Sequence, residues 1–286
     1  MKKQKFLFAL CCIATMFIAG CGSSSKNNNN NSSGSNISGV FADAPVVGLS
    51  YSCGSTTGLT QAGGAFTCPK NSTVTFTVGG VTVCSAPAQA LMTPVSCAQA
   101  NGNPSADAST SSVVATAQFL ISIGTPAGTT TGSLSTLTIT SAELQAASSV
   151  SLDFSTATQA ELQTAVSTIN PGQTLASAST AQTELTGTIA TNVAGTYSGG
   201  YSGNASGTWS ITIDASSNVS GSYTDSKNGT GTVSGSLANG TTYSGTAGSA
   251  TWTGTVNTSK PPGTGTGAYL FSGTWTNGSD SGSFTN

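Results

Sequence analysis

The last third of the chain alternates small polar residues with aromatic or β-branched ones, in short runs separated by Asn, Asp and Gly. Across 208–213 (TWSITI) the apolar residues share one face of an extended strand and the hydroxyls share the other, as a half-buried strand requires. The pattern predicts strands at 195–201, 207–213, 219–224, 230–237, 242–247, 250–256, 267–275 and 281–285. Such antiparallel strands favour a closed up-and-down barrel, because closure removes exposed edges, and an open meander is the alternative.

Residues 37–98 show a shorter period-two pattern. Strands are expected at 37–42, 46–52, 73–78 and 81–83, and Gly79-Gly80 is a two-residue hairpin signal between the last two. The pattern predicts a small β-sandwich.

Helical signals dominate the segment between these two β regions. Val113, Ala117, Leu120 and Ile121 recur at helical spacing, which predicts a helix over about 110–122.

Two capping boxes follow in the same segment. Thr140 precedes Glu143, and Thr158 precedes Glu161, each by the three residues at which Thr and Glu satisfy one another's backbone amides. They predict helices near 141–148 and 159–169, and a further helix is expected at 174–185.

The first twenty residues carry an export pattern. Three lysines precede an apolar run at 6–17, which is too short to cross a hydrocarbon core that needs roughly twenty residues. The sequence Ile18-Ala19-Gly20-Cys21 resembles the lipobox that lipoprotein signal peptidase cuts before cysteine.

That resemblance implies acyl chains on Cys21 and a membrane anchor, since two or more chains hold firmly where one holds only marginally. In such lipoproteins Asp after the cysteine favours the inner membrane, and here Gly22 implies the outer membrane, on either its periplasmic or its surface side. The stretch from Gly22 to Ser35 (GSSSKNNNNNSSGS) predicts a flexible tether.

These patterns predict a mainly β chain with a helical middle segment. The expected parts are a signal peptide (1–20), a lipidated tether (21–36), a β-sandwich (37–98), a helical segment packed on it (99–190) and a barrel-like domain (191–286).

Four cysteines remain after cleavage and acylation: Cys53, Cys68, Cys84 and Cys97. An exported chain permits disulfides, and we expect the sequence-local pairs Cys53–Cys68 and Cys84–Cys97. Each would close a loop of about fifteen residues, worth roughly 3 kcal/mol. A four-thiolate zinc site is the alternative, although no C-x-x-C pair is present to begin it.

A family resemblance is visible in the sandwich. Asp43-Ala44-Pro45-Val46 and the following Val47-Gly48-Leu49-Ser50-Tyr51, with Gly63-Gly64-Ala65-Phe66, resemble the N-terminal Ig-like or prealbumin-like module of proteobacterial surface lipoproteins. Those modules often carry Asp in the turn before the Gly-x-Phe element, whereas this chain has Thr60-Gln61-Ala62. The C-terminal segment resembles, in pattern only, the Gly-rich barrels of surface lipoproteins such as transferrin-binding proteins.

The charged residues, and the side chains that could act in catalysis, restrict the classes of function that this chain can have. The whole chain has seven Lys, no His and nine acidic residues, so it lacks both clustered cations for a nucleic-acid partner and the commonest general base. Glu143 and Glu161 are interpreted as helix caps, and Asp214 and Asp225 as surface turns or a weak calcium site. We therefore expect neither a catalytic site nor a resident metal or cofactor.

The aromatic residues are the better functional candidates. All three tryptophans, Trp209, Trp252 and Trp275, fall in the C-terminal segment together with Tyr269. They are expected to fill the barrel interior, or to line a surface that binds a ligand, a sugar or a protein. The leading hypothesis is a noncatalytic lipoprotein that displays β modules for binding or adhesion to a protein or glycan partner. The alternative is a carrier of a small apolar ligand inside the barrel, and an enzyme with paired carboxylates is a third.

Overall fold

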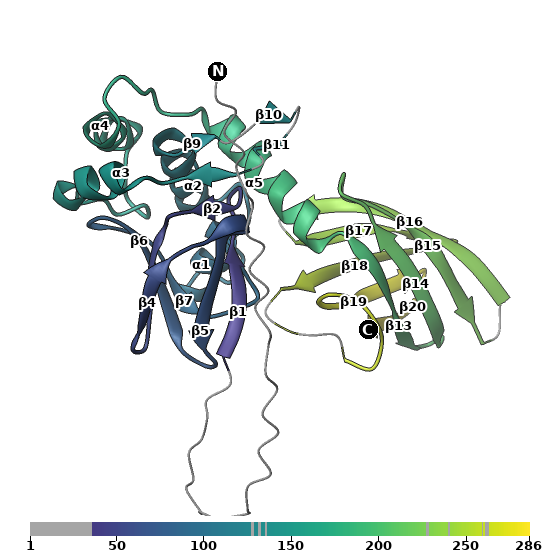
Figure 1. Ribbon diagram of the computed structural model, residues 1–286. Coiled ribbons are helices and arrows are strands. Elements are labelled where there is room, and N and C mark those ends of the chain that lie inside the picture. Colours follow the sequence, from purple (N-terminus) through teal and green to yellow (C-terminus); the bar gives the residue numbers. More distant parts are fainter. Residues whose placement is uncertain are drawn as a thin grey trace, which may run out of the picture. The chain divides into compact units, whose positions relative to one another are not determined.

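The computed structural model describes residues 36–126, 129–130, 133–134, 136–226, 229–239, 241–258, 260 and 263–286. It contains small N-terminal sheets, a helical middle segment and a closed barrel of eight antiparallel strands, which confirms the predicted mainly β fold class (Figure 1). The predicted signal peptide, the lipidation site Cys21 and most of the tether lie outside the described residues.

The N-terminal strands are β1 (Asn36–Phe41), β2 (Val46–Val47), β3 (Ser50–Cys53), β4 (Thr56–Leu59), β5 (Ala65–Pro69), β6 (Thr73–Val78), β7 (Val81–Pro87) and β8 (Leu91–Met92). All of them except β2 form two facing sheets. One sheet has the order β5-β1-β8 and the other β4-β3-β6-β7. Phe41 and Phe66 of the first sheet contact Phe76 of the second at ring-centroid distances of 4.7 and 5.1 Å, so aromatic rings fill the space between the sheets.

The strand predicted at 46–52 is two strands in the structure. Gly48 has φ +82°, and a Cβ there would lie 2.1 Å from the carbonyl oxygen of Ile139. The chain turns at this glycine, so that β2 pairs with β12 (Leu137–Thr138) while β3 joins the larger sheet. The predicted Gly79-Gly80 hairpin is confirmed, with Val78 paired to Val81.

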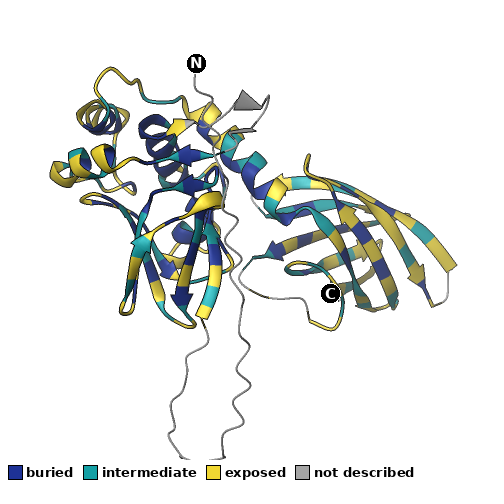
Figure 2. Cartoon of the chain, viewed as in Figure 1, coloured by how far each residue is buried: buried dark blue, intermediate teal, exposed yellow. Residues whose placement is uncertain are grey.

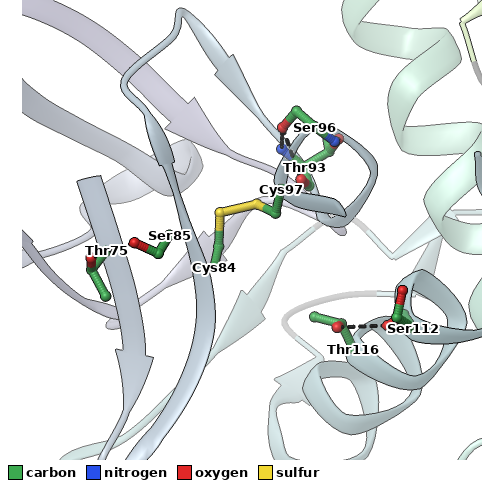
Figure 3. The surroundings of a disulfide bond; sticks show 8 residues. All are labelled: Thr75, Cys84, Ser85, Thr93, Ser96, Cys97, Ser112 and Thr116. Atoms are coloured by element: carbon green, nitrogen blue, oxygen red, sulfur yellow. Dashed lines mark hydrogen bonds between the residues drawn. A yellow bond between two sulfur atoms is a disulfide. The ribbon is translucent and has the colours of Figure 1, made fainter. Parts of the chain in front are cut away.

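Both sequence-local disulfides are present. Cys53–Cys68 joins β3 to β5, and therefore one sheet to the other, with 5.8 Å between the Cα atoms. Cys84–Cys97 ties β7 to the helix α1 (Pro94–Ala100), with 5.4 Å between the Cα atoms (Figure 3). The four cysteines are paired in disulfides, and the zinc alternative is therefore excluded.

The helical middle segment follows the predicted caps. Its helices after α1 are α2 (Ser111–Ile123), α3 (Ser141–Ala146), α4 (Gln159–Ile169) and α5 (Ala178–Val193). Thr140 and Glu143 form the predicted capping box at α3, and Thr158 and Glu161 form the one at α4. The helix expected at 174–185 begins and ends later, because Ser177 is its N-cap and no proline or strained glycine stops it before Val193.

Helices α2 and α4 share a core with the sandwich, whereas the buried side chains of α5 belong to the apolar cluster of the barrel. Phe119 of α2 contacts Phe154 at 5.3 Å between ring centroids, and both belong to the apolar cluster that contains Phe41 and Phe76. The amide of Gly80, at the tip of the β6–β7 hairpin, donates to the carbonyl of Ala147 at 3.1 Å. The remaining short elements are η1 (Ala62–Gly64), β9 (Thr125–Pro126), β10 (Thr129–Thr130), β11 (Ser133–Leu134) and η2 (Ala147–Ser149).

The barrel strands follow one another in sequence order and close on themselves. They are β13 (Gly195–Gly203), β14 (Gly207–Ile213), β15 (Asn218–Asp225), β16 (Gly229–Asn239), β17 (Thr242–Ala247), β18 (Ala250–Asn257), β19 (Leu270–Asn277) and β20 (Asp280–Thr285). Residues 200–203 of β13 pair with residues 282–285 of β20, which completes the ring. The sequence left a closed barrel and an open meander as alternatives, and the structure has the closed barrel.

Candidate functional site

The two faces of the barrel strands differ sharply in chemistry. Along β14 the inward residues Trp209 and Ile211 are buried, whereas Thr208, Ser210 and Thr212 point outward and are exposed (Figure 2). The other strands repeat this alternation, with Ser or Thr at most outward positions. A strand in contact with lipid would present apolar side chains there, so the outer face has the composition of a surface exposed to water.

Inside the barrel, large residues lie opposite glycines. The register pairs Trp209 with Gly199, Tyr223 with Gly231, Trp252 with Gly245, and Trp275 with Gly282. Each aromatic residue therefore has a neighbour without a side chain beside it on the inner face.

The rings use the space that the glycines leave. A Cβ on Gly231 would lie 2.5 Å from the Tyr223 ring, and a Cβ on Gly235 would lie 2.6 Å from the Trp252 ring. Since real Cβ atoms do not approach other atoms so closely, the glycines allow the rings to lie flat along the wall. Rings held against the wall leave the centre of the barrel open.

The open centre is a cavity of about 390 Å³. All three tryptophans line it, as do Tyr201, Tyr223 and Phe271. Its volume falls within the roughly 300–1,000 Å³ of pockets that hold small molecules. Its lining is mainly aromatic and aliphatic, which is also usual for such pockets.

Phe271 and Phe284 form the floor of the cavity. Their ring centroids lie 5.3 Å apart. Trp209 contacts both of them edge to face at 5.8 and 5.7 Å, and Trp252 does the same at 6.1 and 6.2 Å. Edge-to-face aromatic contacts of this kind fix ring orientation, so the floor is a preformed apolar surface.

The indole N–H groups already have partners in the barrel wall. Trp209 donates to the carbonyl of Gly200 at 3.1 Å, Trp252 to that of Thr246 at 3.3 Å, and Trp275 to that of Ser202 at 3.3 Å. The tryptophans therefore offer a ligand their ring surfaces rather than hydrogen-bond donors.

Polar groups gather at the end of the cavity where the β13–β14, β17–β18 and β19–β20 hairpins turn. Ser249, Asn277 and Asp280 line the cavity at these turns, and Asp225 lines it at the end of β15. The Tyr201 hydroxyl donates to Asp225 with 2.9 Å between the oxygens. Burial, followed by this hydrogen bond and the charge of Asp225, raises the pKa of Tyr201 above its usual value. We call this end, defined by Tyr201, Tyr223, Asp225, Trp275 and Asp280, the mouth.

The opposite end is closed by buried polar and aromatic groups. The side chain of Asn286 is fully buried, accepts from the amide of Phe271 at 2.8 Å and donates to the carbonyl oxygens of Thr266 and Tyr269. Tyr243 is also fully buried here, and burial raises its pKa to about 12. Tyr269 thus lies at this end, and it is not among the residues that line the cavity.

Two further acids, Asp214 and Asp153, have local structural partners. Asp214 accepts from the Asn218 side chain and from the amides of Asn218 and Ser216 in its hairpin, and these bonds lower its pKa, the Asn218 side chain contributing most. Asp153 accepts from the amide and hydroxyl of Ser155, which lower its pKa in the same way. These two acids are therefore turn residues.

Asp43, the first residue of the Asp43-Ala44-Pro45-Val46 motif, is a buried acid. It is fully buried, and neither carboxyl oxygen has a hydrogen-bond partner. Burial, with a smaller contribution from the charge of Glu184, raises its pKa to about 8. In the sequence it directly follows the apolar end of a strand, in Phe41-Ala42-Asp43-Ala44.

Thr60, at the start of the Thr60-Gln61-Ala62 turn, has a structural role. Its hydroxyl donates to the carbonyl of Val46 at 2.6 Å and accepts from the amide of Leu49 at 3.0 Å, all within the core. The threonine thus satisfies the backbone around the turn at Gly48.

The described residues contain no group of three or more His, Cys, Asp or Glu side chains placed to hold a metal ion. Among the helices of this part of the chain, none has the length and apolar character needed to span a membrane.

No protein-family model matches the chain. Comparisons with curated proteins and with solved structures likewise gave no match. Function is therefore inferred from the cavity itself.

Proposed function

We propose that this chain is a noncatalytic lipoprotein, anchored in the outer membrane through Cys21, whose C-terminal barrel binds a small ligand with an apolar body. The observation that carries the proposal is the cavity of about 390 Å³ lined by all three tryptophans of the chain. Between the two hypotheses drawn from the sequence, the cavity favours the carrier, because a barrel meant only for display has no need of a hollow interior.

Two effects favour ligand binding in the cavity: the burial of apolar surface, and aromatic rings whose orientation is already fixed before the ligand binds. A ligand that covers the partly exposed rings of Trp275 and Phe284 gains about 25 cal/mol for each Å² of apolar surface removed from water. The Phe284 ring is already fixed by contacts with Trp209 and Trp252, so little side-chain freedom is lost on binding.

The anchor and tether support a carrier at the envelope. The lipobox-like sequence ends at Cys21, and the polar stretch at 22–35 separates that residue from the first strand, β1. A binding module held in this way would take up its ligand close to the membrane, where apolar molecules accumulate.

Titration of the chain without its signal peptide with N-phenyl-1-naphthylamine, a neutral fluorescent probe, tests the proposal. We expect saturable binding, with energy transfer from tryptophan to the probe. In Ala247→Phe the new ring lies on the inner face and is expected to abolish binding, since Ala247 lines the cavity. Thr246→Phe, on the adjacent outward position, is the matched control and should bind normally. Equal binding by both variants would place the probe elsewhere and overturn the proposal.

Display for adhesion is the second candidate, and the outer face of the barrel favours it. Cross-strand hydroxyl pairs cover that face, among them Thr251 with Thr276 at 3.0 Å and Thr242 with Thr255 at 3.1 Å. An array of hydroxyls can hydrogen-bond a glycan or a protein. Binding of the lipid-free chain to immobilised glycans and envelope proteins tests it, and Thr251→Ala with Thr276→Ala should weaken any true contact with this face.

A further inference from the structure

The apolar wall of the cavity is built from side chains that have little freedom to move. Among the lining residues that the structure describes, none is Met or Leu, and the apolar ones are aromatic, β-branched or alanine. The β-branched residues are Ile211 and Val233, both buried, and side chains of this kind are stiff at χ1. The shape of the wall is therefore set by the fold and changes little when a ligand enters.

The two partly exposed rings of Trp275 and Phe284 are also held in place. A Cβ on Gly282 would lie 2.6 Å from the indole nitrogen of Trp275, and a Cβ on Gly254 would lie 2.5 Å from the Phe284 ring. The indole N–H of Trp275 donates to the carbonyl of Ser202 at 3.3 Å. Both rings thus lie against backbone without a side chain, and they keep one orientation before a ligand binds.

The rings around the cavity stand at large angles to one another. Tyr201 makes an interplanar angle of 86° with Trp275 at 6.1 Å between ring centroids, and of 78° with Tyr223 at 6.5 Å. A flat aromatic molecule that lies along one of these rings therefore turns its edge toward the next. It makes offset-stacked and edge-to-face contacts at once, the two arrangements that aromatic pairs prefer.

From this arrangement we infer that the barrel binds a rigid, planar aromatic compound rather than a flexible acyl chain. The rings of Tyr201, Trp275 and Phe284 contact its faces and edges, and the stiff side chains of Ile211 and Val233 limit its depth in the cavity. This inference rests on the proposed function, because it names the class of ligand for the same cavity.

An acyl chain fits this wall less well for two reasons. A chain loses rotational freedom about each of its bonds when it is held in one shape, whereas a planar ring system has none to lose. Binding surfaces that accept chains of varying shape use adaptable side chains such as Met, which the described lining lacks. The chain also gains nothing from ring geometry beyond the apolar area that it buries.

The test compares three neutral alcohols with the same number of carbon atoms. 2-Naphthol is planar and aromatic, decahydro-2-naphthol has the same fused rings but is saturated, and 1-decanol is a flexible chain. Equilibrium dialysis with gas chromatography measures each association constant, which is then divided by the octanol–water partition coefficient so that general hydrophobicity cancels. We expect the normalised value for 2-naphthol to exceed that for 1-decanol by at least about tenfold, with decahydro-2-naphthol between them.

Variants assign this preference to the rings of the wall. Phe284→Leu keeps an apolar side chain but replaces a fixed ring by a flexible one, and it is expected to reduce the preference for 2-naphthol to about threefold or less. Trp275→Leu is a second variant of the same kind and keeps the test open if the first does not fold. Tyr51→Leu removes a half-buried ring of the sandwich and should leave the preference intact.

The outcomes separate this inference from the proposed function. If none of the three alcohols binds and N-phenyl-1-naphthylamine also fails to bind, the carrier function itself is wrong. If N-phenyl-1-naphthylamine binds but 2-naphthol has no normalised advantage over 1-decanol, the cavity selects by hydrophobicity alone and the inference is overturned. It is likewise overturned if decahydro-2-naphthol equals 2-naphthol, or if the folded leucine variants of the wall keep the full preference.

Discussion

The hydroxyl of Tyr201 reaches across a whole strand to donate a hydrogen bond to the carboxylate of Asp225, with 2.9 Å between the two oxygens. Tyr201 is on β13 and Asp225 on β15, and Gly207 of the intervening strand pairs with both. A Cβ on Gly207 would lie 2.8 Å from the Tyr201 ring. The mouth of the cavity thus depends on a residue that contributes no side chain to it.

Gly207→Ala is expected to destabilise the barrel by about 1–3 kcal/mol, because the new methyl group overlaps the Tyr201 ring and the neighbouring backbone. Urea unfolding followed by tryptophan fluorescence measures the change. Gly200→Ala is the matched control on the same pair of strands, where a Cβ would have only an ordinary contact at 3.7 Å. Equal stability of the two variants would show that the ring does not need this glycine.

Thr60→Val is expected to destabilise the sandwich by about 2 kcal/mol. The valine has nearly the same shape, but it leaves the amide of Leu49 and the carbonyl of Val46 without their side-chain partner in the core. Urea unfolding followed by far-UV circular dichroism reports the loss. Thr57→Val, at an exposed position of β4, should change stability by less than about 0.5 kcal/mol.

The sequence predicted elements well where one face of an element is buried and the other is not. The barrel strands and the α3 and α4 caps were predicted for this reason, since alternation and Thr-x-x-Glu are local signals. The helix α1 was missed because Ser96, rather than Glu or Gln, completes its capping box with Thr93. Strand β4 (TTGL) has no alternation of apolar and polar residues, and β5 alternates only over Phe66, Thr67 and Cys68; both form because sheet partners exist in the fold.

The candidate site was only partly predictable. The sequence pointed to the three tryptophans, and all of them line the cavity. It could not show that the barrel is hollow, because that depends on the register that places Gly231 beside Tyr223 and Gly282 beside Trp275. Phe271, Phe284 and Asp225 became part of the site for the same reason, as their pairing partners lie on other strands.

Cys21→Ala is expected to abolish acylation and the cut before residue 21. The variant lacks the thiol that would carry the acyl chains, so incorporation of a palmitate analogue should disappear and the chain should keep residues 1–20, which is measured as a larger mass. Asn27→Ala, in the polar stretch after the anchor, is a control that should stay labelled and membrane-bound. Labelling of the Cys21→Ala protein would contradict the predicted anchor.

Asp43 makes the free energy of unfolding depend on pH, and its effect is opposite in sign to that of a carboxyl group whose pKa is lowered by folding. Its pKa is about 8 in the folded chain and near the ordinary 3.8 in the unfolded chain, because folding buries the carboxyl group without a hydrogen-bond partner. Between these values the unfolded chain gives up a proton that the folded chain keeps. The free energy of unfolding therefore falls as pH rises from about 4 to about 8, by up to about 1.4 kcal/mol per pH unit.

Asp43→Asn should remove this slope, because the amide is neutral at every pH. We expect the variant to be similar to the parent near pH 4 and more stable than it at pH 8, as measured by urea unfolding with far-UV circular dichroism at several pH values. Glu184→Gln is a graded control: it removes the smaller cause of the shift and should leave most of the slope, since burial is the larger cause. A parent protein whose stability is flat over this range would mean that the Asp43 carboxyl is not desolvated in the folded chain.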